Sequence, residues 1–368
     1  MNSRERVWKV LEFEESDRVP ITELGIDIPH IETITGKTYG GGVVAATLTL
    51  EGRSKEEELI GLTVECYKKL GFDIIEGSIS PPKDWKPRSN PDGTVIDEWG
   101  RILYHDKKCK KWIQGAKAIF ETTEEWENFS FPDPFAPGRS DGLEYMKRLV
   151  DGEMVFAGSI RDPFALLWEM FTPINFVKWM YQNLQFIKRT FDRITAYNAH
   201  IINLLADCGV ELIISGGDWC EKLGPMVPLK FFREVIFPSL RRQVDTAHSR
   251  GLKFIKHTDG NIMPLLEDLS NIVDGLHSLD PSAGVDIGEV KKRCGDKIVL
   301  LGNVSVDNLA RKGKEDIITE AKECIRKASP GGGHILSSSN TWFTDAKLEN
   351  CLAMVEASKK FGIYPLRL

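Results

Sequence analysis

The sequence lacks the long apolar stretch, about 18 residues or more, that a membrane-spanning helix requires. Residues 1–9 are rich in charge and lack the apolar core of a secretory signal peptide. The seven cysteines form no Cys-x-x-Cys pair, and an odd number of scattered cysteines is typical of reduced thiols. These absences predict a cytoplasmic protein that contacts no membrane.

The chain also has no excess of positive charge. It carries 48 lysines and arginines against 54 aspartates and glutamates, a formal net charge of −6 at pH 7. Nucleic-acid binding needs a concentrated basic face, so this balance argues against a nucleic-acid partner. The 368 residues, 42% hydrophobic and 28% charged, are ordinary for a globular protein and sufficient to bury a large core without disulfides.

Short apolar runs alternate with helix-like segments along the chain. Each run is rich in Val, Ile, Leu or Phe and almost continuously apolar, which is typical of strands buried on both faces of a parallel sheet. The segment 54–70 shows the apolar spacing of a helix. The runs that we predict to be strands are Val19–Thr22, Asp73–Ile75, Met154–Gly158, Leu212–Ser215, Lys253–Lys256, Val273–Leu279, Ile298–Leu301 and His334–Leu336.

Eight buried strands alternating with helices predict an α/β fold, a (β/α)8 TIM-type barrel that spans residues 1–368 as a single domain. An open doubly wound sheet is the alternative. It would be expected to carry Gly-x-Gly-x-x-Gly after an early strand, and this sequence has no such motif. The closed barrel is therefore the favoured fold.

Residues 81–137 interrupt the alternation of strands and helices. They contain Asn-Pro-Asp-Gly at 90–93 and Trp-Gly at 99–100, two turn sequences next to the β-rich runs 94–98 and 101–105. We predict a β-hairpin insertion between strands two and three, placed over the barrel mouth. A purely structural lid and a segment that contacts substrate are equally consistent with this pattern.

Polar residues follow the predicted strands, and barrel enzymes place their reactive groups at the C-terminal ends of strands. A ring of polar groups on apolar strands is costly unless the groups are used. Any single member can instead cap a helix, because Asp and Asn favour that position. In chain order the ring is Glu23, Glu76, Arg161, Asp162, Asp218, His257, Asp259, Asp280, Asn303 and Asn340.

The segment His-Thr-Asp-Gly-Asn at 257–261 is the most informative part of this ring. A histidine at the end of a buried strand, two residues from a carboxylate, directs imidazole and carboxylate toward one point. Such a pair can bind Zn²⁺ or form a base with its orienting group. The alternative is that His257 bonds to a turn while Asp259 caps the helix that follows.

The segment Lys253–Leu269 resembles the strand-five signature of the uroporphyrinogen-decarboxylase superfamily, which includes cobalamin-dependent methyltransferases. Other segments match in order and with similar spacing: DRVP at 17–20, GGD at 216–218, VLLGNV at 299–304 and GGHILSSSN at 332–340. The resemblance covers about residues 15–362. It is specific for the superfamily and implies the barrel fold, but it is much less specific for the reaction.

The decarboxylase branch holds a tetrapyrrole with many carboxylates through an arginine-rich N-terminal segment, RQAGRY. The corresponding segment here, TELGIDIPH at 22–30, has no arginine and carries Glu23 and Asp27. Glu76 lies near the place of the decarboxylase strand-two aspartate, and Asn340 stands near the place of a histidine. A decarboxylase-like lyase is therefore the alternative hypothesis.

The zinc methyltransferases of the superfamily use His-x-Cys after strand five and a further cysteine after strand eight. This sequence keeps His257 but has Asp259 and Asn340 at or near the cysteine positions. A site without cysteine is harder and suits an oxygen-bearing substrate better than a thiol. The resemblance thus implies methyl transfer from a methoxylated aromatic compound, or a similar small donor, to the Co(I) corrinoid of a partner protein.

In this hypothesis the same residues can hold Zn²⁺ or form an acid–base cluster without metal, and both remain open. Aromatic side chains beside the site are expected to stack on an aromatic donor. Besides the corrinoid protein, a second copy of the chain is an expected partner, and another barrel hydrolase or lyase that uses the His/carboxylate cluster is a further alternative. The predicted roles are catalysis for His257, Asp259, Asp218 and Glu76; substrate binding for Glu23, Arg161, Trp219, Asn340 and Trp342; and metal binding for His257, Asp259 and Asp218.

Overall fold

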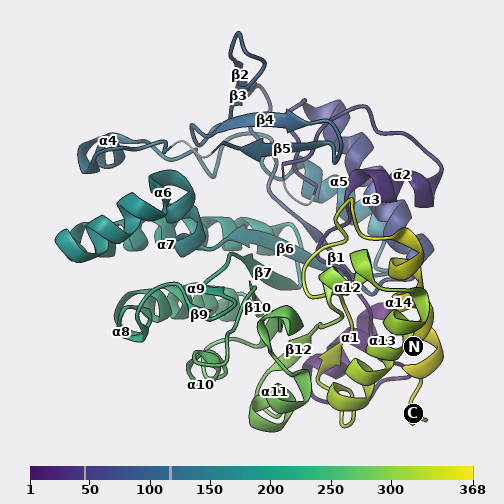
Figure 1. Cartoon of the computed structure of the whole chain (residues 1–368). Coiled ribbons are helices and arrows are strands. Elements are labelled where there is room, and N and C mark those ends of the chain that lie inside the picture. The colour runs from purple at the N-terminus through teal and green to yellow at the C-terminus, as the bar shows by residue number, and fades with distance from the viewer. Residues whose placement is uncertain (45–46, 116–117, 368) are drawn as a thin grey trace.

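A seven-stranded parallel sheet is the centre of the computed structural model, which describes residues 1–44, 47–115 and 118–367 (Figure 1). The strands are hydrogen-bonded in chain order, and each neighbouring pair is parallel. The architecture is α/β and TIM-barrel-like. In order the strands are β1 (Ile74–Gly77), β6 (Val155–Arg161), β7 (Leu212–Gly216), β10 (Lys253–Thr258), β11 (Gly275–Ser278), β12 (Val299–Leu301) and β13 (His334–Ile335).

These seven strands confirm seven of the predicted apolar runs, with shifts of up to three residues at their ends. The first predicted run, Val19–Thr22, is not a strand in the structure. It forms one parallel bridge, between Ile21 and Leu336 just beyond β13. The Asp73 N–H, next to β1, donates to the Ile21 carbonyl at 2.8 Å. The run therefore lies between the two edge strands of the sheet and bonds to both sides.

Helix α1 (Ser3–Leu11) closes one end of the sheet. Its Val7, Val10 and Leu11 pack in one buried cluster with inward-facing residues of the strands, among them Val155 and Leu212. Alternate strand residues point to opposite faces, so the remaining strand residues face the helices instead. With this end filled by apolar side chains, reactive groups are left to the opposite end of the strands.

The remaining helices follow the strands along the chain, and their buried faces join a second, larger apolar cluster. Among the described residues, no helix has both the length and the apolar character needed to cross a membrane. The principal helices are α2 (Ile28–Thr35), α3 (Arg53–Leu70), α4 (Thr123–Asn128), α5 (Asp141–Val150), α6 (Pro163–Gln182), α7 (Leu184–Asp207), α9 (Phe237–Ser249), α10 (Leu266–Leu269), α11 (Ile287–Cys294), α12 (Val306–Arg311), α13 (Lys314–Ala328) and α14 (Leu348–Phe361).

A separate antiparallel sheet of short strands falls between β1 and β6 in the sequence, inside the predicted insertion 81–137. Figure 1 shows it apart from the parallel sheet, in the upper part of the view. Two of its strands occupy the runs 94–98 and 101–105 and pair with each other. In order the strands are β2 (Arg88–Ser89), β3 (Val95–Ile96), β4 (Ile102–Asp106) and β5 (Lys111–Gln114).

Candidate functional site

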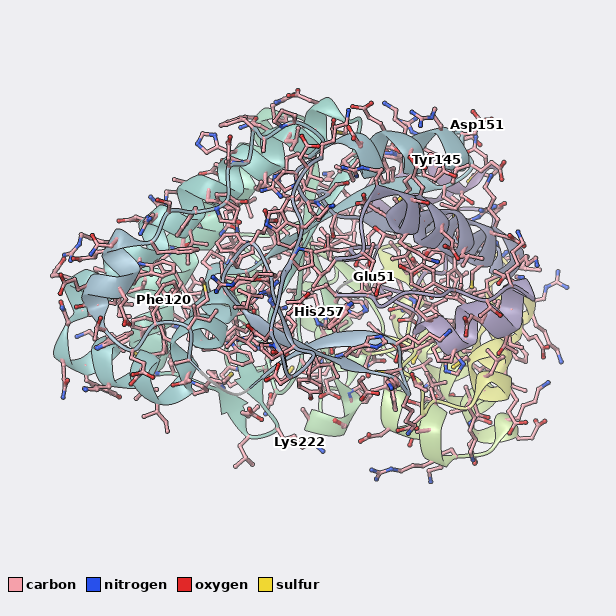
Figure 2. All side chains as sticks on the ribbon, turned by 90° about the horizontal axis from the view of Figure 1, so that it is seen from above. Glu51, Phe120, Tyr145, Asp151, Lys222 and His257 are labelled. Atoms are coloured by element: carbon pink, nitrogen blue, oxygen red, sulfur yellow. The ribbon has the colours of Figure 1, made fainter. Side chains whose placement is uncertain are left out.

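A cavity of about 530 Å³ lies at the C-terminal ends of the parallel strands. Glu76 of β1, Arg161 of β6 and His257 of β10 reach its wall from the strands. Glu98, Trp99, Arg101 and Lys111, from the antiparallel sheet and its connections, also line it. In a view from above, His257 lies near the middle of the molecule (Figure 2). The volume is within the range of small-molecule sites.

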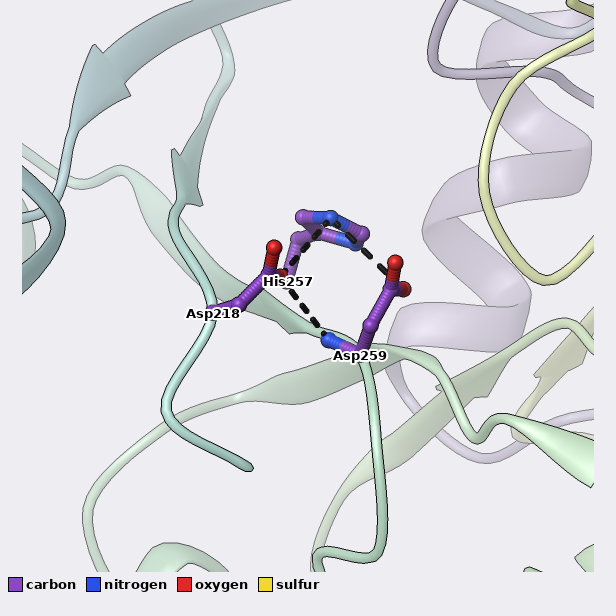
Figure 3. A group of neighbouring side chains, drawn as sticks. All are labelled: Asp218, His257 and Asp259. Carbon is purple, nitrogen blue, oxygen red and sulfur yellow. Dashed lines mark hydrogen bonds and ion pairs between the residues drawn. The ribbon is translucent and has the colours of Figure 1, made fainter. Parts of the chain in front are cut away.

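Asp218, His257 and Asp259 form one cluster at the ends of two neighbouring strands (Figure 3). His257 Nε2 lies 3.8 Å from Asp218 Oδ1 and 3.9 Å from Asp259 Oδ1. One ligand atom from each residue lies within 4.8 Å of the others. Distances near 4 Å are too long for direct hydrogen bonds but leave space for an ion between the three groups.

Parallel strand pairing explains how residues forty positions apart meet. His257 is opposite Gly216 in the β7–β10 register, so Asp218 follows β7 beside the end of β10. The Asp259 N–H then donates to Asp218 Oδ1 at 3.0 Å. Gly260 has a φ of +80°, and a Cβ there would stand 2.4 Å from the Cys220 carbonyl oxygen. Glycine is therefore required at this turn.

Burial and the charges of neighbouring groups shift the pKa values of the three side chains of the cluster. Burial lowers the pKa of His257 in spite of its two acidic neighbours, which favours the neutral imidazole. Burial raises the pKa of Asp259 more than His257 lowers it. Burial also opposes ionisation of Asp218, but His257, the Asp259 N–H and Lys256 together hold the pKa of Asp218 below its usual value. A neutral imidazole beside carboxylates is a suitable ligand set for a divalent cation.

Asn340 and Asp259 are linked by a hydrogen bond. The Asn340 amide donates to Asp259 Oδ2 and also forms part of the cavity wall. Asp259 Oδ1 is buried and has no hydrogen-bond partner among the described residues. An orphaned carboxylate oxygen costs free energy unless a cation or a ligand completes it. The three side chains thus fit a metal ion.

Glu76 lies on the cavity wall with its Oε2 buried and without a hydrogen-bond partner among the described residues. Burial raises its pKa to about 8. The side chain is therefore mainly a neutral carboxylic acid at pH 7, and such a group can donate a proton to a bound molecule.

Arg161 also reaches the cavity, where it forms an ion pair with Glu169 of α6. Burial opposes its charge, but Glu169 holds the pKa of Arg161 above its usual value. Glu169 is itself a cavity residue, so the pair presents both charges to the space. The predicted substrate-binding position of Arg161 is consistent with this location.

Glu23 lies beside the final strand segment, and it is not among the described cavity-lining residues. It is 2% exposed and accepts hydrogen bonds from the Ser338 N–H at 3.1 Å and the Ser338 hydroxyl at 2.7 Å. Burial raises its pKa to about 8 despite these donors. Its contacts indicate that it fixes the segment before Asn340, not that it touches substrate.

Glu23 should make the protein less stable as the pH rises. Its carboxyl keeps its proton up to about pH 8 in the folded chain but loses it near pH 4.3 in the unfolded chain. The folded state thus binds more protons across this window, and the free energy of unfolding falls as pH rises through it. In Glu23→Gln this fall should be smaller by a few kcal/mol, measured by urea unfolding at pH 5 and pH 8. An unchanged slope would contradict the assignment.

The predicted stacking roles of Trp219 and Trp342 are wrong. Both rings are fully buried, and neither is among the described residues of the cavity wall. Trp219 Nε1 donates to Asp162 Oδ1 at 2.9 Å, and the Trp342 ring packs edge-on against Phe72. The aromatic residues of the wall are Trp99 and Tyr197, whose rings meet edge to face at 5.1 Å.

Three other members of the predicted ring cap helices or bond to a turn instead of lining the described cavity. Asp162 caps the first turn of α6, and Asp280 caps the short 3-10 helix Pro281–Ala283. Asn303 is buried and donates to the Leu279 carbonyl at 2.7 Å. These are the helix-cap and turn functions that Asp and Asn favour. Asp280 is outside the described cluster.

Lys256 is a buried cation that sequence reasoning missed, although a lysine within an apolar strand was a visible signal. Its ammonium group donates to the carbonyls of Gly217 and His257 at 2.7 Å each, and lies 3.7 Å from Asp162. Burial lowers its pKa. Lys256 thereby ties the ends of β7 and β10 together, which sets the spacing between Asp218 and His257.

Lys256→Met should lower the free energy of unfolding by about 3 kcal/mol, because it leaves buried carbonyls and Asp162 without their cation. Lys253→Met is the matched control on the same strand; Lys253 is one-third exposed and pairs with Asp274 at 3.6 Å. This control should change stability by less than about 1 kcal/mol. Denaturant unfolding of both variants measures the difference, and equal losses would contradict the assignment.

His277 is the second residue that sequence reasoning missed. It is fully buried on β11, opposite His257 of β10 in the strand register. The two Nδ1 atoms lie 2.8 Å apart, and His277 Nε2 lies 3.2 Å from Ser337 Oγ. Burial keeps the pKa of His277 well below its usual value, so the ring is neutral. The histidine within the run 273–279 was visible in the sequence, but its partner depends on register.

The chain is similar to known proteins over most of its length. The family model of uroporphyrinogen decarboxylase matches residues 111–361. A uroporphyrinogen decarboxylase of Coxiella burnetii is 23% identical over 184 residues, 50% of each protein, so the match spans about half of that relative. Another from Dechloromonas aromatica is 24% identical over 283 residues, 72% of this chain and 75% of the relative. The solved structure of a methyltransferase from Methanosarcina mazei superposes with a TM-score of 0.73 at 17% identity, covering 98% of this chain and 99% of that one.

Proposed function

The chain belongs to the uroporphyrinogen decarboxylase family, and we propose that it transfers a methyl group from a small methylated donor, such as a methoxylated aromatic compound, to the Co(I) corrinoid of a partner protein. One observation carries the proposal. Glu76, whose raised pKa favours the neutral acid, and His257 of the Asp218–His257–Asp259 cluster line the same cavity. An ether donor needs these functions because its oxygen leaves badly unless it is protonated or polarised.

The charges of the cavity argue against a decarboxylase acting on a polycarboxylate. The two arginines of the described wall are already paired, Arg101 with Asp97 at 2.6 Å and Arg161 with Glu169. Lys111 of the wall pairs with Asp27, one of the two acidic residues of the segment 22–30. A substrate with many carboxylates needs unpaired cations to hold it. The paired charges instead suit a small donor with at most one ionic group.

Asp218, His257 and Asp259 would hold the metal ion, for which the orphaned Asp259 Oδ1 and the spacing of the three side chains provide the fit. A bound Zn²⁺ would act as a Lewis acid toward an oxygen of the donor. The carboxylates and imidazole without cysteine form a hard ligand set, consistent with an oxygen-bearing donor.

The cavity residues would bind and orient the donor. Trp99 and Tyr197 offer aromatic faces to a planar ring. Glu76 would give its proton to the leaving oxygen as the bond between that oxygen and the methyl carbon breaks. The new bond forms between the methyl carbon and cobalt; Co(I) supplies both electrons and becomes methyl-Co(III). The products are the demethylated alcohol or phenol and the methylated corrinoid, which the partner protein carries away.

Residues 81–137 form an insertion in the single domain in this proposal, and their antiparallel sheet would take part in docking the corrinoid protein. Glu98, Trp99, Arg101 and Lys111 of this segment already line the cavity. A partner that delivers cobalt to the donor must approach this side of the molecule. Self-association as a homodimer remains a prediction.

A methyl-transfer assay tests the proposal. The purified protein is mixed with a reduced corrinoid protein and a panel of methoxylated aromatic compounds and methylamines. Loss of Co(I) absorbance with formation of methyl-Co(III) supports it. Wild type and Glu267→Gln, whose side chain is 76% exposed, should behave alike. Absence of a change with every donor, combined with CO₂ release from uroporphyrinogen, would replace methyl transfer with the lyase alternative.

A further inference from the structure

We infer that His277 is a positioning residue that holds the His257 ring in one tautomer, with Nδ1 protonated and the Nε2 lone pair directed at the space between Asp218 and Asp259. The inference rests on the proposed function, because it concerns how that metal site is prepared. It assigns a role to a contact between two histidines on neighbouring strands, the cavity residue His257 on β10 and the buried His277 on β11.

The orientation of the Ser337 hydroxyl is the first step of the argument. Ser337 Oγ donates its proton to the Ser338 carbonyl oxygen at 2.9 Å. A hydroxyl has one proton to donate and two acceptor lone pairs. Toward any other neighbour, Ser337 Oγ therefore acts as an acceptor.

The His277 ring is fixed by this acceptor. His277 Nε2 lies 3.2 Å from Ser337 Oγ, so Nε2 must carry the proton that is donated. The ring is fully buried, and its described contacts are with Ser337, His257 and the backbone of Ser338, none of which is a carboxylate. Without a carboxylate partner, the charged imidazolium is costly at this depth, so the ring is neutral. A neutral imidazole has a single N–H, which leaves a lone pair on His277 Nδ1.

The lone pair on His277 Nδ1 determines the state of His257. The two Nδ1 atoms are 2.8 Å apart, a hydrogen-bond distance, and only one of them can supply the proton. Because His277 Nδ1 is the acceptor, His257 Nδ1 is the donor. The neutral His257 ring then has its lone pair on Nε2, which faces Asp218 Oδ1 at 3.8 Å and Asp259 Oδ1 at 3.9 Å.

This arrangement prepares His257 to coordinate a cation. Histidines that ligate metals usually donate their other ring N–H to an outer partner, which fixes the tautomer and the ring orientation. Here a second imidazole occupies the place that a carboxylate or carbonyl commonly takes. A neutral outer partner adds no negative charge to the site, so the two carboxylates alone supply the charge that attracts the cation.

Two variants of the full-length chain test the inference. His277→Leu removes the acceptor, and His277→Asn offers an amide oxygen in its place. We expect the dissociation constant for Zn²⁺, measured by calorimetry with the metal alone, to rise about 10- to 100-fold in His277→Leu. His277→Asn should recover most of this loss. Wild-type affinity in His277→Leu, or no recovery with asparagine, would overturn the inference.

Nitrogen NMR of the metal-free protein gives a second readout. Wild type should show His257 protonated on Nδ1 alone, and a ring protonated on Nε2 would overturn the inference. If His277→Leu does not fold, Ser337→Ala serves instead: it removes the acceptor for His277, and the His257 signal should shift toward a mixture of tautomers. An unshifted signal in Ser337→Ala counts against the inference.

Failure of this inference and failure of the proposed function look different. A protein that shows the Nδ1 tautomer and binds Zn²⁺ but methylates no corrinoid disproves methyl transfer and leaves the role of His277 intact. A protein that transfers methyl groups at the same rate and binds Zn²⁺ equally in wild type and His277→Leu keeps the proposed function and disproves the inference.

Discussion

His257→Ala is expected to release the metal ion and to abolish methyl transfer. It removes the single nitrogen ligand of the cluster and leaves Asp218 and Asp259 to hold a cation as two partly exposed carboxylates. Loss of an outer partner alone typically costs about 10- to 100-fold in metal affinity, and loss of the ligand itself should cost more. Elemental analysis of the purified variant and the Co(I) absorbance assay measure the two effects.

His200→Ala is the matched control for this experiment. His200 is an exposed histidine that packs edge-on against Phe135 and belongs neither to the described cluster nor to the described cavity wall. Its replacement should change neither metal content nor rate. If His257→Ala keeps its metal, the ligand assignment is wrong. If wild type contains no metal and His257→Ala still loses activity, the cluster works as an acid–base group, the reading that the sequence left open.

Much of the fold could be predicted from the sequence because its strands are buried on both faces and so are nearly continuous in apolar character. The run Val19–Thr22 has the same composition, but it forms one bridge at Ile21 instead of a regular strand. Composition sets burial, whereas the length of a strand depends on how many of its hydrogen bonds meet a partner. The partners available to a strand depend on the three-dimensional arrangement of its neighbours, which the apolar pattern of the sequence does not show.

Sequence reasoning likewise found some residues of the candidate site and missed others. Asp218, His257 and Asp259 could be found because each follows or ends a strand, and parallel strands end at a common edge. His277 and Lys256 lie within strands, and their partners depend on register between strands, which no local pattern reveals.

The two tryptophans show a different limit of sequence reasoning. Trp219 directly follows Asp218, and Trp342 lies two residues after Asn340, yet both rings point into the apolar core. Adjacent residues in an extended segment point in opposite directions, which turns Trp219 away from Asp218. Asn340 lies in a bend, so the two-residue alternation of a strand does not carry over to Trp342. Trp99 reaches the cavity from an insertion whose docking the sequence could not specify.

The rate of methyl transfer should fall as the pH rises through about 8, because Glu76 must carry a proton to give it to the leaving oxygen. Burial raises the pKa of Glu76 to about 8, so the acid form dominates below that pH and is lost above it. An unperturbed glutamate would lose its proton near pH 4.3 and leave almost no acid at neutral pH. The measurement is the pH dependence of kcat under saturating donor.

Glu76→Gln keeps the size and neutrality of the protonated side chain but has no acidic proton. General acid catalysis typically contributes about 10²- to 10⁴-fold, so kcat should fall by that order and the loss of rate near pH 8 should disappear. Glu23→Gln is the control for this loss of rate near pH 8. Burial raises the pKa of Glu23 to about 8 as well, but Glu23 is not among the described residues of the cavity wall. This control should keep both the rate and the pH profile. If the loss of rate near pH 8 disappears in Glu23→Gln but persists in Glu76→Gln, Glu23, which is bonded to Ser338, supplies the proton. The assignment of Glu76 is then wrong.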